Sequence, residues 1–123
     1  MSENTGGDSF QLDIEKISQE LRVRPEIFKR LVISFSKSIV EKIQMLEQAL
    51  TQDDSVKARA ILHELKGTSG NLRLQPVFEA VETLHVAVKA GDSKEKQQEY
   101  FASLKARCQE FIEYAGRLSA SSS

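Results

Sequence analysis

The chain has 123 residues, of which 28 % are charged and 40 % hydrophobic, and its formal net charge is −1. That length fits a single domain that is large enough to bury a core of its own. Proteins that bind nucleic acid usually have a basic excess, which this composition lacks. We therefore expect no nucleic-acid partner.

Residues 1–10 are polar and contain glycine, so they are predicted to be a disordered lead-in. Residues 11–21 have the pattern of a short amphipathic helix with Asp13 as its N-cap, placed across one end of the fold. From Pro25 to Gln52 apolar residues recur at intervals of three and four, which predicts one long helix.

Two further helices are predicted over residues 55–72 and from Pro76 to Gly91, the latter a natural residue after a helix end. A last helix follows up to Leu118, and residues 119–123 are predicted to be a disordered tail. Short turns between four long helices imply antiparallel neighbours. We thus predict an all-α fold, an up-down antiparallel four-helix bundle with an additional short N-terminal helix, over residues 11–118.

The third predicted helix has a narrow apolar stripe with the spacing of a bundle helix. Its members are Ala58, Leu62, Leu65, Ser69 and Leu72. His63 lies about 100° from Leu62 around the helix, so it falls at the edge of the stripe rather than inside it. The sequence therefore predicts an accessible imidazole.

Two glycines follow His63 on the same side of this helix, Gly67 and Gly70. A glycine inside a helix costs about 1 kcal/mol relative to alanine, which indicates a local purpose. Arg59 and Lys66 place positive charge within reach of anything bonded to the imidazole. An accessible histidine beside bare backbone and cations is what a phosphoryl acceptor needs.

The segment His63-x-Leu65-Lys66-Gly67-Thr68-Ser69-x-x-Leu72 resembles the signature of histidine-containing phosphotransfer (HPt) domains, H-x-L-K-G-[ST]-[SA]-x-x-L-G. Arg73 replaces the final glycine. The resemblance extends from about Leu12 to about Leu118. The competing interpretation is a bundle helix with an incidental histidine at its edge, and seven matched positions outweigh it.

The resemblance implies a glutamate or glutamine, hydrogen-bonded to the imidazole, at the position that His85 occupies here. His85 either accepts the Nδ1 proton of His63, leaving Nε2 as the nucleophile, or points away. A metal site at the two histidines is not expected, because no cysteine or carboxylate has ligand spacing with them. Lys89 lies either near the phosphate or in solvent.

An HPt domain accepts phosphate from an aspartyl phosphate on a receiver domain and passes it to a second aspartate. Lys66 would offset the phosphoryl charge and Gly67 would allow close approach. We expect no cofactor on this chain, with Mg²⁺ supplied by the receiver. No ATP-binding loop is present in the sequence, so a phosphoryl carrier is predicted rather than a kinase.

The expected partners are response-regulator receiver domains and a hybrid sensor histidine kinase, bound by a monomer. The predicted docking residues are Val56, Arg59, Gly70, Asn71, Arg73 and Lys89, with Phe35 or Ile39 from the long helix. Arg73 either tunes the choice of partner or is solvated at a helix end.

Three functions fit the sequence: a phosphorelay protein that carries phosphate between receiver domains, the phospho-accepting domain of a chemotaxis-type kinase, and a helical adaptor without covalent chemistry. The relay is either a free-standing protein or a C-terminal HPt domain excised from a hybrid sensor kinase. Cys108 is the sole cysteine, which fits a reducing cytosol. No apolar run approaches the roughly 18 residues of a membrane span, and there is no signal-peptide pattern. The expected location is cytoplasmic, without a membrane partner.

Overall fold

The computed structural model describes residues 10–122, which contain five helices. They are α1 (Ile14–Leu21), α2 (Pro25–Thr51), α3 (Ser55–Asn71), α4 (Gln75–Ala90) and α5 (Lys94–Ser122). Within that range no strand occurs, so the predicted all-α fold is confirmed.

Local sequence explains where the helices begin. The Asp13 and Asp54 carboxylates each accept a hydrogen bond of 3.1 Å from a backbone N–H in the first turn of α1 and α3. Pro25 is the first residue of α2 and Pro76 the second of α4, where a missing N–H costs nothing.

Helices α1 to α4 all end in the same way. Just beyond each of them lies a residue with positive φ, which turns the backbone so that the following amides can bond back to the last helical carbonyls. These residues are Arg22 (φ 59°), Asp53 (57°), Arg73 (61°) and Gly91 (71°). After α3, for example, the Leu74 N–H donates to the Ser69 carbonyl at 2.8 Å.

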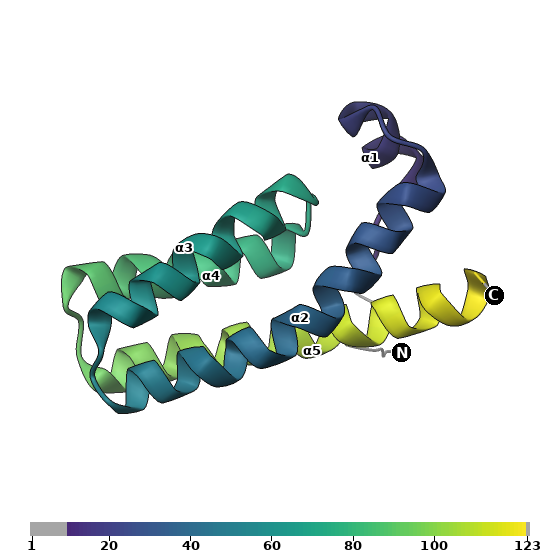
Figure 1. Cartoon of the computed structure of the whole chain (residues 1–123). Helices are drawn as coiled ribbons and strands as arrows, with labels where there is room; N and C mark the ends of the chain where they lie inside the picture. Colours follow the sequence, from purple (N-terminus) through teal and green to yellow (C-terminus); the bar gives the residue numbers. More distant parts are fainter. Residues whose placement is uncertain (1–9, 123) are drawn as a thin grey trace, which may run out of the picture.

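The four long helices form a closed ring of neighbours, because α2 packs on α3, α3 on α4, α4 on α5 and α5 on α2. Short turns make successive helices antiparallel, and the α3–α4 hairpin lies along α2 and α5 (Figure 1). The predicted up-down four-helix bundle is confirmed. Helices α2 and α5, with 27 and 29 residues, extend past α3 and α4, with 17 and 16 (Figure 1).

The core lies inside this ring and is built from side chains with no more than 1 % of their surface exposed. Each helix of the bundle contributes to it. Its largest members include Phe28, Ile39 and Leu46 from α2, Leu62 and Leu65 from α3, Leu84 from α4, and Leu104 and Phe111 from α5.

Where α2 and α5 extend past the hairpin, the N-terminal part of the chain covers them. Helix α1 packs beside α2 at that end (Figure 1). The ring of Phe10, only 1 % exposed, lies 5.6 Å from that of Phe111 and 5.3 Å from that of Tyr114, centroid to centroid. The prediction of a disordered lead-in is wrong at Phe10, because aromatic burial on α5 fixes this residue. The rest of that prediction, residues 1–9, lies outside the described residues.

The predicted disordered tail also differs from the structure, since α5 continues through Ser122. Alanine is the strongest helix former and serine weakens a helix only slightly, and no proline or positive-φ residue occurs between Leu118 and Ser122, the last described residue. Leu118 itself packs against the core. Ser123 lies outside the described residues.

We expect Phe10→Ala to lower the free energy of unfolding by about 3 kcal/mol, because it removes a buried ring and leaves a cavity against two aromatic neighbours. Urea denaturation followed by circular dichroism measures the change. Gln19→Ala on the exposed face of α1 is the control, with an expected change within about 0.5 kcal/mol. Equal effects of the two substitutions would contradict the role of Phe10.

Candidate functional site

The predicted stripe of α3 faces the core. All five residues of the stripe are buried, four of them completely, and His63 is exposed beside them. Ser69, the polar member of the stripe, donates its hydroxyl proton to the Leu65 carbonyl at 2.7 Å, so its burial leaves no unpaired polar atom. The rotation of α3 therefore presents the imidazole of His63 at the surface.

His63 lies on the side of α3 that meets α4. Its ring centroid is 6.5 Å from that of His85, and the rings are arranged edge to face. His85 is only 9 % exposed and belongs to α4. No hydrogen bond joins the two rings among the contacts of residues 10–122, so the first of the two expected arrangements, in which His85 accepts the Nδ1 proton of His63, is not present here.

The electrostatics around His85 favour its neutral form. Burial lowers its pKa below the ordinary histidine value, and the positive charges of Lys89 and Lys66, together with His63, lower the pKa further. The carboxylate of Glu82 acts in the opposite direction but does not outweigh them. The surroundings of His85 thus oppose the protonated form of its imidazole.

Two lysines flank the histidine pair. The Lys66 ammonium lies 3.7 Å from a Glu82 carboxylate oxygen, in a pair with both side chains about two-fifths exposed. Such a pair contributes little to stability because water screens it, so Lys66 exchanges partners at low cost. Lys89 lies in the last turn of α4, and Arg59, one turn before His63, donates from Nε to the Ser55 carbonyl at 3.3 Å.

The two glycines of α3 have different surroundings. A Cβ added at Gly67 would meet nothing within 4 Å, so the backbone there is open, as predicted. A Cβ at Gly70 would lie 3.3 Å from two ring carbons of Phe78 on α4. The prediction that Gly70 also clears space beside His63 is therefore wrong in its reason, because this glycine allows α3 and α4 to pack closely.

Gly67→Ala and Gly70→Ala are a matched pair that separates these two reasons. Alanine at Gly67 should raise the free energy of unfolding by up to about 1 kcal/mol, since it restores helix propensity without contact. Alanine at Gly70 should give a smaller gain or a loss, because the Phe78 ring must shift. Equal stabilisation in thermal or urea unfolding would show that Phe78 does not restrict position 70.

Arg73 follows the end of α3 and has a left-handed backbone, with φ at 61°. Glycine adopts this conformation without strain, which gives a conformational reason for the glycine of the HPt signature. Its guanidinium donates to the carbonyls of Gly70 and Asn71 at 3.3 Å each, and its Nε lies 3.6 Å from a Glu20 carboxylate oxygen of α1. Arg73 thus caps α3 and contacts α1, an arrangement that neither sequence-based alternative included.

We expect Arg73→Gly to raise the free energy of unfolding by about 0.5 to 1 kcal/mol, because removal of the Cβ relieves the left-handed strain. Arg73→Ala is the control, since it removes the same guanidinium contacts but keeps the Cβ. The comparison by urea unfolding isolates the backbone contribution. If the glycine variant is no more stable than the alanine variant, the backbone strain at position 73 is refuted.

On the other side of His63, a groove lies between α2 and α3. It is lined by Leu31 and Ser38 from α2 and by Glu64 and Asn71 from α3, among others. Lys42 and Glu64 form an ion pair of 3.0 Å across it. The groove gives α2 an accessible surface close to the exposed face of α3.

Leu31, not Phe35 or Ile39, is the exposed apolar residue that α2 supplies here. Leu31 is 46 % exposed, whereas Phe35 and Ile39 are 6 % and 0 % exposed. The sequence-based choice is therefore wrong for Ile39, which is buried and does not line the groove, whereas Phe35 does line the groove but with little exposed surface. Val56 on α3 is 69 % exposed, as its predicted docking role requires, and Asn71 is also exposed.

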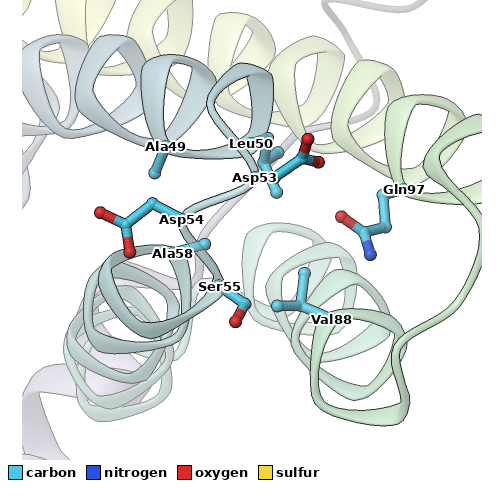
Figure 2. A pocket seen from close by; sticks show the side chains of 8 residues that line it. All are labelled: Ala49, Leu50, Asp53, Asp54, Ser55, Ala58, Val88 and Gln97. Carbon is cyan, nitrogen blue, oxygen red and sulfur yellow. The ribbon is translucent and has the colours of Figure 1, made fainter.

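A separate cavity of about 70 Å³ lies at the far end of the bundle, near the α2–α3 turn. Figure 2 shows Leu50, Val88 and Gln97 around it, from α2, α4 and α5. It contains none of the residues near His63. Over residues 10–122, no group of three or more His, Cys, Asp or Glu side chains is placed to hold a metal ion.

Comparison with known protein families identifies the class. Residues 30–114, more than half of the chain, match the family model of the Hpt domain, so the chain belongs to the Hpt family. Hpt domains are phosphoryl carriers rather than kinases, with a role in histidine phosphotransfer, and their partners are receiver domains of two-component systems. No curated protein and no solved structure matches the chain. None of the helices in residues 10–122 is long and apolar enough to cross a membrane.

Proposed function

We propose that His63 is the phosphoryl-accepting residue of a phosphorelay, taking the group from a receiver aspartate and passing it to a second receiver. The supporting observation is an exposed imidazole one turn before Gly67, where even an added Cβ would meet nothing within 4 Å. The active site of a receiver can therefore approach His63 closely.

The proposed transfer is a single displacement at phosphorus. A lone pair on an imidazole nitrogen of neutral His63 forms the N–P bond while the P–O bond to the aspartyl carboxyl breaks, and the aspartate leaves as a carboxylate. The second receiver reverses the step with its own carboxylate. Because the charged groups that act on the neighbouring His85 are two lysines and a single carboxylate, that of Glu82, we assign Mg²⁺ to the receiver and no cofactor to this chain.

Lys66 is proposed to neutralise charge on the phosphoryl oxygens as it develops. Its 3.7 Å pair with Glu82 holds the ammonium on the α4 side of His63, and both side chains are accessible enough for that pair to open. Lys89 adds positive charge from α4, and Arg59 adds it from α3, one turn before His63. Together these cations would attract the acidic pocket of a receiver.

The proposed docking surface is the exposed face of α3 together with the adjoining groove on α2. Val56, Gly67 and Asn71 supply the α3 side, and Leu31 supplies an apolar contact from α2. A contact that forms and dissolves with each transfer should be small, below about 1,200 Å². Gly70 and Arg73 are proposed to act through the packing of α3 rather than through direct contact.

A domain of a hybrid sensor histidine kinase would use the same site and the same chemistry, so the proposal covers both settings. We further propose that the protein acts as a monomer in the cytoplasm. A helical adaptor without covalent chemistry is a less favourable function, because binding alone needs neither an exposed imidazole nor the adjoining lysines.

We expect His63→Gln to abolish labelling by a receiver domain that bears a ³²P-labelled aspartyl phosphate. The label on the unmodified chain should survive alkali and be lost in acid, as a phosphoramidate does. His85→Gln is the matched control and should still accept label. Retention of label by His63→Gln would refute the assignment.

A further inference from the structure

His85 is a buried titratable group beside the proposed phosphoryl acceptor. It is 9 % exposed, and its ring faces that of His63 across the α3–α4 contact at 6.5 Å between centroids. No hydrogen bond joins the rings among the described residues. The two imidazoles are thus neighbours without a direct hydrogen bond, so a phosphoryl group bonded to the His63 nitrogen nearer to α4 would lie beside His85.

The charged and titratable groups that face His85 come from both helices of this contact. Helix α3 supplies His63 and Lys66, and α4 supplies Glu82 and Lys89. With two lysines against one carboxylate, and with burial acting in the same direction, the pKa of His85 lies below its ordinary value. Before phosphorylation, the surroundings therefore oppose a proton on this imidazole.

We propose that His85 takes up a proton when His63 is phosphorylated, and that it then donates a hydrogen bond to the phosphoryl group. This inference rests on the proposed function. It makes His85 a positioning residue for the phosphoryl group and couples the state of His63 to pH. The HPt resemblance implies a glutamine or glutamate at this position. Neither of these side chains would gain a proton near neutral pH as a histidine can.

The reason is electrostatic. A phosphoryl group adds a charge of about −1.5 to −2 and three strong acceptor oxygens, directly beside a ring that previously faced two ammonium groups. An opposite charge at a few ångströms stabilises the protonated imidazole, and so does a hydrogen bond from it. Both effects raise the pKa of His85.

The atoms balance without any further reactant. The N–P bond on His63 forms as the P–O bond to the receiver aspartate breaks, and His85 forms no bond to phosphorus. It gains one proton from solvent on phosphorylation. The same proton returns to solvent when the phosphoryl group leaves for the next receiver.

Thermodynamic linkage makes the coupling reciprocal. If phosphorylation raises the pKa of His85 by one unit, protonation of His85 favours phosphorylated His63 by up to tenfold. The effect is complete below both pKa values and is lost as the pH rises through the higher one. Through His85 alone, a fall in pH would thus favour retention of phosphate on this chain, and a rise would favour its release to a receiver.

The test is to titrate both histidines by NMR before and after chemical phosphorylation with potassium phosphoramidate. The chain has only two histidines, so the imidazole signals are few and assignable with His85→Gln. The pKa of His85 should rise by about one unit or more in the phosphorylated protein. If the pKa of His85 is unchanged or lower in the protein phosphorylated on His63, the inference is overturned.

Phosphorus NMR on the same samples separates this result from failure of the proposed function. Absence of a phosphohistidine signal at His63 would count against the proposed function instead.

A pair of lysine variants tests the electrostatics without any phosphate. Lys89→Gln should raise the pKa of His85, because it removes a positive charge that lowers it. Lys105→Gln on α5 should leave the pKa of His85 unchanged, because Lys105 lies between α5 and α2 and is not among the charges that act on His85. Equal changes in the pKa of His85 from the two substitutions would contradict a local effect of Lys89 on His85.

Discussion

The complete burial of Leu62 and Leu65 fixes the rotation of α3, and the rest of the site depends on that rotation. A helix with both leucines in the core must place His63 at the surface, because successive residues are separated by about 100° around the axis. The same rotation directs Glu64 toward Lys42 on α2 and Lys66 toward Glu82 on α4. The accessible imidazole is thus a consequence of core packing rather than of any contact that His63 makes itself.

The close approach of α3 and α4 is the second condition for this site. Gly70 lets the Phe78 ring lie against the α3 backbone, and further along the same contact His85 faces His63. The close packing at Gly70 and the facing imidazoles thus belong to one contact between α3 and α4. The signature of the family includes glycines for separate reasons: open access at Gly67, and left-handed backbone at the position of Arg73.

Helix order, caps and the α3 stripe could be predicted from the sequence because each depends on local spacing: Asp13 and Asp54 cap, Pro25 begins a helix, and Leu62 and Leu65 recur at bundle intervals. The failures depend on tertiary contacts. Nothing local shows that Phe10 packs on Phe111, that Gly70 faces Phe78, or that Leu31 stays accessible while Phe35 does not. The left-handed φ of Arg73 was also missed, although the glycine it replaces indicated it.

The way in which Phe10 closes one end of the fold has a consequence for local opening. Its contact with Phe111 joins distant parts of the chain, and α1 packs on α2 rather than on α3 or α4. Because segments with few contacts open without unfolding the whole domain, α1 should detach as a unit while the α3–α4 hairpin remains folded. Amide protons of α1 would then exchange with solvent faster than those around His63, and the imidazole pair would keep its geometry during such excursions.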